Sequence, residues 1–316
     1  MSMRGARPMT PQRLRASLNA RLRNAAAERE VSSEELRKQF VFTLLFRRLF
    51  HERADRWLVL GGNALLLRTR GGRFTQDLDL ARAEHWSSEE ELKEELEQVF
   101  ARDVDDPFVF SLRYLQEHDH RDAYGYGTRT AKASVVVQLG GHEFDAFTID
   151  ISKHRHIDTV VDFIDPVPVI EHDLLKDLPR IPVVPIENHL ADKICAMYET
   201  YPGRISWSTR YRDLADIVRI VQGVEIDAAA LVTMLDHERQ RRRISSLPLE
   251  MCAPHESWTR EYPKAAQQFA GFPRELLSVK DSLEFAGRCL DEVLNRSRVQ
   301  GRWSPAQQMW LDETWT

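Results

Sequence analysis

Apolar residues recur at helical spacing in two stretches at the start of the chain. Pro11, after a capping threonine, can start a first helix that runs to about Glu30. Ser32 with Glu35 three residues later has the form of a capping box. The apolar positions that follow predict a second amphipathic helix to about Glu52. The chain therefore begins with a pair of helices.

The pattern then changes to short strand-like runs. "RWLVLGGNALLLRT" predicts a strand, a Gly-Gly turn and a helix start, "FTQDLDLARA" a strand, and "SSEEELKEELEQVF" a helix. "ASVVVQL" and "HEFDAFTIDIS", separated by Gly140-Gly141, predict a hairpin. A proline-punctuated stretch then marks a boundary, and from Ile186 the pattern is helical. We predict an α+β protein with two domains, residues 1–180 and 181–316.

Composition narrows the class of protein. The 316 residues are 42% hydrophobic, which is enough for a large core. The net charge is -5, so any nucleic-acid contact has to use a local basic patch. The three cysteines are too widely spaced for a disulfide framework or a CxxC metal site. No apolar run approaches the roughly 20 residues of a membrane span, and the basic N-terminus lacks the apolar core of a signal peptide. We expect a cytoplasmic protein without membrane contact.

Two carboxylates stand one residue apart in "FTQDLDLARA". Residues i and i+2 of a strand point to the same face, so Asp77 and Asp79 project together while Leu78 and Leu80 face the core. Their repulsion is relieved by a cation between them, and oxygen ligands suit Mg²⁺. Taken alone, the pair could equally be two acids on a solvated strand face.

The surroundings of this pair favour a site. Gly61-Gly62 precede a predicted helix N-terminus, where backbone N–H groups favour phosphate, and Asn63 adds an amide donor. On the second hairpin strand, Asp145 and Asp150 face opposite sides, so only one can join the pair. Asp150 lies between isoleucines, and we assign it as the third acid, leaving Asp145 as a solvated residue. Three carboxylates beside a phosphate-binding turn describe a two-metal phosphoryl-transfer site.

"GGNALLLRTRGGRFTQDLDL" resembles the signature of polymerase-beta-like nucleotidyltransferases, and more closely the form found in the AbiEii/AbiGii toxin family. "PIENHLADKICAMYE" and "STRYRDLADIVRI" resemble that family's lysine helix and arginine–aspartate helix. The motifs occur in the family's order from Gly61 to Asp216. Two positions depart from the pattern: Asn63 replaces the usual Ser or Thr, and Arg212 the common Lys.

The resemblance implies a nucleotidyltransferase fold with a mixed sheet, and roles for individual residues. Asp77, Asp79 and Asp150 would hold two Mg²⁺ ions, with Asp150 placed to help activate an attacking hydroxyl. The Gly61-Gly62 turn would hold the triphosphate of an NTP. Arg73 and Thr75 would shape the strand start and the triphosphate pocket.

The two helical motifs can also be interpreted from their apolar stripes. Lys193 lies at the margin of its stripe, so its stem can pack on the core while its charge reaches a cleft. Arg210 and Asp213 flank the next stripe. For these three residues the alternative is an inter-helix salt bridge. The family implies that Lys193 neutralises the triphosphate, that Asp213 orients either Lys193 or the acceptor, and that Arg210 binds nucleotide. We expect Asp192 to point away, and the i, i+4 neighbours Arg212 and Asp216 to form a surface pair.

A basic run, "HERQRRR", contains Arg239, Arg241, Arg242 and Arg243. It is either a solvated helix end or an RNA phosphate contact, and the arginines of the first helix form a second candidate patch. The pairs His118/His120 and His154/His156 fit no zinc spacing and are expected in exposed loops.

We therefore expect a nucleotidyltransferase toxin that transfers a nucleoside monophosphate from an NTP to RNA. By resemblance the acceptor is the tRNA 3′ end, and the partner a separately encoded antitoxin. One alternative acceptor is a protein or small-molecule hydroxyl. A second alternative is a non-catalytic NTP-binding regulator, which would not need Asp150.

Overall fold

The computed structural model describes residues 10–51, 56–69, 74–84, 86–121, 127–153, 161–200 and 207–312. Its N-terminal half carries a seven-stranded mixed sheet in the order β3-β4-β5-β2-β1-β7-β6. The strands are β1 (Trp57–Val59), β2 (Asp77–Arg82), β3 (Phe108–Arg121), β4 (Gly127–Leu139), β5 (His142–Lys153), β6 (Asp162–Ile164) and β7 (Ile181–Val183). The predicted α+β class is confirmed.

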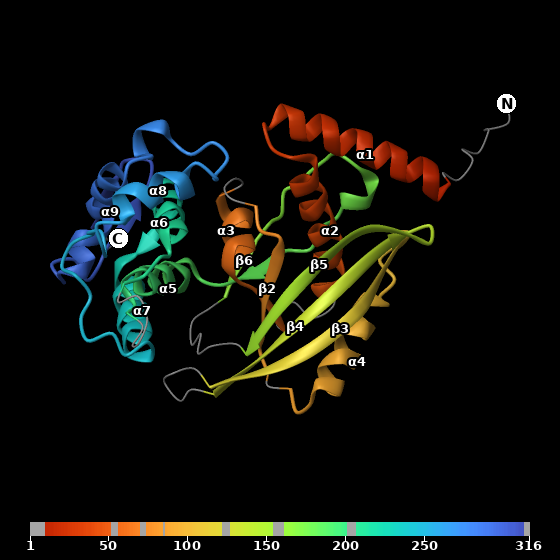
Figure 1. Cartoon of the computed structure of the whole chain (residues 1–316), viewed down its shortest axis with the longest axis horizontal. Helices are drawn as coiled ribbons and strands as arrows, with labels where there is room; N and C mark the ends of the chain where they lie inside the picture. The colour runs from red at the N-terminus through yellow and green to blue at the C-terminus, as the bar shows by residue number, and fades with distance from the viewer. Residues whose placement is uncertain are drawn as a thin grey trace.

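Helices accompany this sheet and follow it (Figure 1). Those of the N-terminal half are α1 (Pro11–Glu28), α2 (Ser33–Leu49), α3 (Gly61–Thr69) and α4 (Glu89–Phe100), with a 3-10 turn η1 (Asp173–Leu175). Those that follow are α5 (Ile186–Tyr198), α6 (Tyr211–Gly223), α7 (Ala228–Arg241), α8 (Trp258–Ala266) and α9 (Val279–Leu294), with η2 (Arg274–Leu276). Among the described residues, no helix has the length and apolar character needed to cross a bilayer.

The predicted local signals at the N-terminus are present. The backbone N–H of Glu35 donates to Ser32 Oγ at 3.1 Å, and that of Ser32 donates to Glu35 Oε2 at 3.0 Å, which completes the capping box. β4 and β5 form the predicted antiparallel hairpin. Gly140 and Gly141 join them with φ of 61° and 78°, a left-handed conformation that glycine adopts without strain.

Two buried clusters form the core. One spans the sheet with α1, α2 and α4 and ends at Val184; the other fills the C-terminal half from Ile186. Leu65 of α3 packs in the second cluster although α3 contacts β2, so α3 connects the two halves. Figure 1 shows α3 between the sheet and the blue-green helices.

Two sequence expectations were wrong. The C-terminal half is not all helical, because β8 (Ile226–Asp227), β9 (Arg302–Ser304) and β10 (Met309–Leu311) form a small sheet. Strands this short leave no alternating pattern to detect. His118 and His120 lie in strand β3, not in a loop, since that strand continues along β4 to Arg121. His154 and His156 lie outside the described residues.

Candidate active site

The strand acids lie on one face of the sheet. β2 and β5 are parallel neighbours whose register places Asp79 beside Asp150 and Asp77 beside Thr148. Leu78 of β2 is fully buried on the opposite face, as the alternation predicts. The register therefore gives all three acids a common side, with the Asp79–Asp150 pair at its centre.

Neighbouring side chains already engage two of these acids. The hydroxyl of Thr148 donates to Asp77 Oδ1. Lys132 of β4 is the register partner of Asp150, and its Nζ lies 3.4 Å from Asp150 Oδ1. The Asp150 carboxylate raises the pKa of Lys132, so that this amine is charged at neutral pH. Sequence reasoning missed Lys132, which only strand register reveals.

The Gly61 turn closes against Asp79. Gly61 begins α3 with φ of 57°, and the preceding Leu60 N–H donates to the Asp79 carbonyl at 2.9 Å. A Cβ added to Gly61 would lie 2.0 Å from Asp79 Oδ2. The backbone therefore approaches the carboxylate as only glycine allows. The N–H groups at the start of α3 point into the same space.

A cavity of about 390 Å³ joins this turn to the C-terminal half. Its wall contains residues from α3, β2, α5 and α6, among them Gly61, Gly62, Asp79, Lys193, Arg210 and Asp213. The structure thus brings together the glycine turn, one strand acid and the helical motifs that lie more than a hundred positions later in the chain. One wall carries Lys193 and Arg210, paired with acids of α6, and the other carries the backbone N–H groups of the glycine turn. These donors are suited to a polyphosphate.

Lys193 is held by two carboxylates. Its Nζ lies 2.5 Å from Asp216 Oδ2 and 3.3 Å from Asp213 Oδ1, and Arg210 Nε donates to Asp213 Oδ2 at 2.5 Å. Burial favours the neutral amine, but Asp216 and Asp213 outweigh it and raise the pKa of Lys193. Asp216 is 5% exposed, so the predicted Arg212–Asp216 surface pair is wrong. Arg212 instead donates to Gln268.

Sequence comparison places these residues in a family. The family model described as "Nucleotidyl transferase AbiEii toxin, Type IV TA system" matches residues 43–295. The chain belongs to the AbiEii family of nucleotidyltransferase toxins. The family implies a nucleotide substrate and an antitoxin partner. No curated protein matches the chain significantly.

Two solved structures similar to this chain are the nucleotidyltransferase toxin MenT4 and JHP933. MenT4, a nucleotidyltransferase toxin of Mycobacterium tuberculosis, is 17% identical over 88% of this chain and 97% of its own, with a TM-score of 0.50. JHP933 of Helicobacter pylori is 15% identical over 75% of this chain and 90% of its own, with a TM-score of 0.40. The likeness to MenT4 supports the nucleotidyltransferase-toxin fold for this AbiEii protein.

Two predicted nucleotide contacts of this AbiEii protein, Asn63 and Thr75, do not line this cavity. The amide of Asn63 donates to the Asp77 carbonyl at 2.9 Å, and this 4% exposed side chain lines a different cavity, behind α3. It therefore supports the start of β2 in this structure and not the triphosphate. The Thr75 hydroxyl is buried without a hydrogen-bond partner among the described residues, away from the acid cavity. Arg73 lies outside the described residues.

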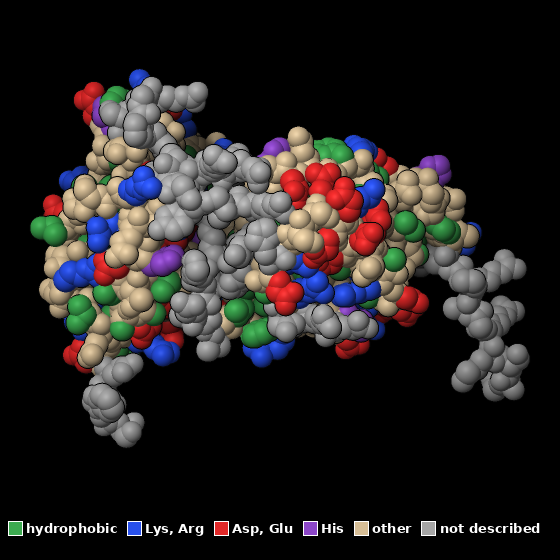
Figure 2. Space-filling view, turned by 90° about the horizontal axis from the view of Figure 1, so that it is seen from below, with side chains coloured by type: hydrophobic (Ala, Val, Ile, Leu, Met, Phe, Trp, Pro, Cys, Tyr) green, Lys and Arg blue, Asp and Glu red, His purple; other side chains and the backbone are tan. Residues whose placement is uncertain are grey.

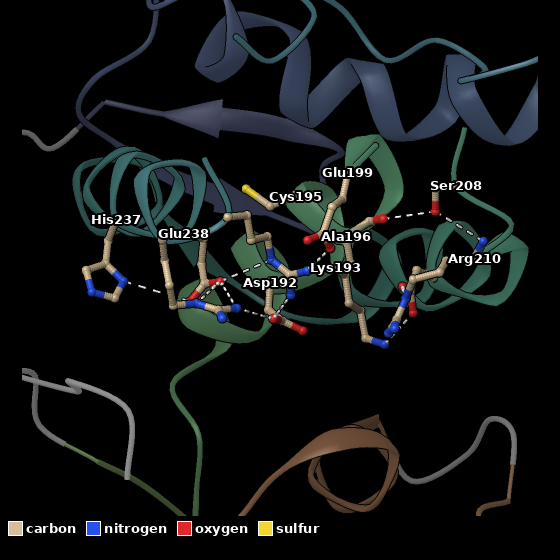
Figure 3. A network of polar contacts seen from close by, with 12 residues as sticks. Asp192, Lys193, Cys195, Ala196, Glu199, Ser208, Arg210, His237 and Glu238 are labelled. Atoms are coloured by element: carbon tan, nitrogen blue, oxygen red, sulfur yellow. Dashed lines mark hydrogen bonds and ion pairs between the residues drawn. The ribbon is translucent and has the colours of Figure 1, made fainter. Parts of the chain in front are cut away.

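The basic run of α7 is largely neutralised within the AbiEii protein. Arg242 donates to Asp192 and Glu199 at 2.5 Å each, and Arg241 donates to Glu238 at 2.6 Å. Burial opposes ionisation of Asp192, but Arg242 and Arg241 outweigh it and lower the pKa of Asp192 to about 2. Asp192 thus points towards the arginines at the end of α7, and its side chain is 41% exposed. Figure 3 shows Asp192 facing the Glu238 end of α7 while Lys193 faces Arg210.

The other two arginines of this run also have partners. Arg239 donates to the carbonyls of Ile244 and Ser245 at 3.3 and 3.2 Å. Arg243 has a φ of 50° just beyond the helix end and is also engaged in an interaction. The run therefore supplies little uncommitted positive charge for RNA.

Asp145 corrects a further expectation. It is not solvated: its side chain is 9% exposed, and Lys38 Nζ lies 2.5 Å from Asp145 Oδ1. This ion pair ties α2 to the core face of β5. Asp145 and Asp150 nevertheless face opposite sides of the sheet, because Asp145 lies on the α2 side and Asp150 lies beside Asp79.

The acid face fits Mg²⁺ through its donor chemistry. Within the described ranges, no three or more His, Cys, Asp or Glu side chains are grouped as a ready metal cage. Mg²⁺ commonly binds through one or two carboxylates, with waters and substrate phosphates completing its octahedron. The hard oxygens of Asp77 and Asp79 meet that requirement, and Asp150 stands beside them in register.

Proposed function

We propose that this AbiEii toxin transfers a nucleoside monophosphate from an Mg²⁺-bound NTP to RNA, at the 3′ end of tRNA. The observation that carries the proposal is the cavity in which Asp79 meets the Gly61 turn, Lys193 and Arg210. Acid, phosphate-binding turn and cations are the components that phosphoryl transfer requires. A binding regulator would need no third acid beside the pair.

The nucleotide polyphosphate occupies the space between α3 and α5. The first N–H groups of α3, at Gly61 and Gly62, have no partner within the helix and attract phosphate. Lys193 and Arg210 supply positive charge from the opposite wall. Asp213 contacts both cations and so fixes their geometry. The N–H groups of the turn, the two cations and Asp213 therefore act together to bind and orient the leaving pyrophosphate.

Asp77, Asp79 and Asp150 would hold two Mg²⁺ ions. Bound there, the ions would supply positive charge to stabilise the attacking and leaving oxygens of an in-line displacement. Asp150, 45% exposed and next to Asp79, is placed to accept the proton of the attacking hydroxyl.

RNA as the acceptor is supported by the charge distribution. α1 exposes Arg13, Arg21 and Arg23, and within the described residues none of the three forms an ion pair. Acidic side chains gather instead over the outer face of α4, seen in red in Figure 2. The α1 arginines replace the committed α7 run as the surface that contacts RNA phosphates at a distance from the site.

The test is incubation with each α-labelled NTP, Mg²⁺ and total cellular RNA, followed by a denaturing gel. We expect label in tRNA, released by 3′ exonuclease digestion. Label in protein would assign the alternative acceptor. Nucleotide binding without any covalent label would favour the regulator, and an Asp79→Asn preparation serves as the background control.

A further inference from the structure

A second cavity adjoins the acid face, on the β4 side of the acid strands and across β2 from β1 and α3. It has a volume of about 410 Å³ and is lined by Asp79, Asp150, Lys132, Thr130 and His118. Asp79 lines both cavities. Asp79 therefore stands between two spaces, with Asp150 in the second, while the glycine turn, Lys193 and Arg210 line the first.

Lys132 gives the second space its own cation. Among the described residues that line it, Lys132 is the one Lys or Arg side chain. The register Asp79–Asp150–Lys132 runs across β2, β5 and β4, so Lys132 lies one strand beyond the third acid. Its side chain is 39% exposed, and its Nζ is 3.4 Å from Asp150 Oδ1. It can therefore contact Asp150 and a ligand together.

The chemistry of nucleotidyl transfer assigns opposite sides to donor and acceptor. The attacking oxygen and the leaving pyrophosphate stand roughly in line across the α-phosphorus. With the pyrophosphate between Gly61 and Lys193, the attacking hydroxyl has to arrive across Asp79 from the opposite side. That side is the Lys132 cavity. The argument rests on the proposed function, which places the polyphosphate.

We propose that the Lys132 cavity is the acceptor subsite, and that Lys132 binds the last phosphodiester of an RNA 3′ end. The 3′ hydroxyl attacks the α-phosphorus, a P–O bond to RNA forms, and the bond to pyrophosphate breaks. The hydroxyl proton passes to Asp150, and pyrophosphate leaves on the Lys193 side. Lys132 is an acceptor-binding residue that also orients Asp150 through their ion pair.

The experiment pairs one enzyme charge with one ligand charge. Wild type and Lys132→Gln are compared on tRNA with either a natural last linkage or a neutral methylphosphonate there. We expect each single change to raise the KM for tRNA about tenfold, and the two together to add little, because both remove the same contact. The Mg-NTP affinity should stay within twofold. Lys132→Arg should restore most of the tRNA affinity, and Lys280→Gln, at an exposed position of α9, is the matched control.

The results separate this inference from the function it rests on. If Lys132→Gln remains as sensitive to the methylphosphonate as wild type, or loses NTP affinity in parallel, the acceptor subsite is wrong while RNA transfer stands. If wild type labels no RNA, the proposed function fails and the subsite falls with it. Thermal melting of each variant checks the fold, which a half-exposed strand position should not disturb.

Discussion

Gly61 and Asp79 are in such close contact that position 61 has no room for a side chain. A Cβ there would lie 2.0 Å from Asp79 Oδ2, and the φ of 57° is itself unfavourable for any other residue. These two residues, from the phosphate turn and the acid strand, therefore constrain each other. The contact makes the glycine a requirement of the site.

Gly61→Ala should displace Asp79 or the start of α3. We expect a stability loss of roughly 1–2 kcal/mol from the left-handed backbone, and a loss of transfer of roughly 100-fold from misplacement of the acid. Gly223→Ala is the control, because nothing lies within 4 Å of its added Cβ and its φ is ordinary. Chemical denaturation and transfer rates measure both. Equal behaviour of the two variants would show that the approach of Gly61 to Asp79 has no consequence.

Asp79→Asn should remove Mg²⁺-dependent transfer without unfolding the protein. The substitution relieves the repulsion between Asp77 and Asp79 but halves the negative charge of this pair. Loss of a residue that only supports a metal ligand costs roughly 10–100-fold in metal affinity or activity, and we expect a larger fall in transfer here. Calorimetric Mg²⁺ titration with NTP present measures the binding. Asp177→Asn, at an exposed position, should behave as wild type. Transfer retained at saturating Mg²⁺ would exclude Asp79 as a metal ligand.

Lys193→Met should both destabilise the folded protein and abolish its transfer activity. It leaves Asp213 and Asp216 buried without their shared cation, and breaking such a pair costs about 3–5 kcal/mol. The double change Lys193→Met/Asp216→Leu should recover much of that stability, since Arg210 still neutralises Asp213, but no activity. This separation distinguishes a nucleotide-binding lysine from a structural one. An active double variant would make Lys193 structural.

The exposed pair Asp173–Lys176 supplies the matched control for that experiment. The side chain of Asp173 is 86% exposed and lies 2.6 Å from Lys176 Nζ. Asp173→Asn should leave the stability almost unchanged, because solvent screens an exposed ion pair.

His189 should make stability depend on pH. It is 5% exposed, its Nδ1 is buried without a hydrogen-bond partner among the described residues, and burial, aided by Lys193, lowers its pKa from 6.5 to about 3. The unfolded chain binds the proton more readily, so stability is lost as pH falls through 6.5 towards 3. The limiting slope is about 1.4 kcal/mol per pH unit.

Denaturation of wild type and His189→Leu between these pH values checks that expectation. The variant should lose most of the slope in the upper part of the window, above the range in which Asp192 titrates. Exposed His142→Gln should retain it. Identical profiles for wild type and His189→Leu would exclude a buried neutral imidazole.

Arg242→Met should act on stability and not on RNA. Glu199 is a buried partner of this guanidinium, whereas the half-buried Glu238 also keeps Arg241, so the loss of charge compensation at Glu199 should cost about 3–5 kcal/mol. Exposed Arg288→Met is the control. RNA affinity over a salt series should be unchanged for the folded fraction. A flattened salt slope with unchanged stability would instead restore the α7 run as a phosphate contact.

The chain itself determined the features that depend on local spacing. The alternation around Asp77 and Asp79 specifies which face they share, because side chains in a strand alternate whatever surrounds them. The capping box at Ser32 and the glycine turn at 140–141 are equally local, since each is completed by neighbouring residues. The family motifs likewise indicated Lys193 and Asp213 as candidates.

Tertiary structure decided which charges meet. Lys132 faces Asp150 only because the β4–β5 register, interrupted by a bulge after Val137, places them opposite each other. Asp216 meets Lys193 across the contact between α5 and α6. The sequence could not show this, because α5 is buried on most of its sides and its apolar stripe does not indicate which face contacts α6. Arg242 forms an ion pair with Asp192, which lies fifty positions earlier in the chain. Such pairings depend on distances across the fold, on which spacing along the chain carries no information.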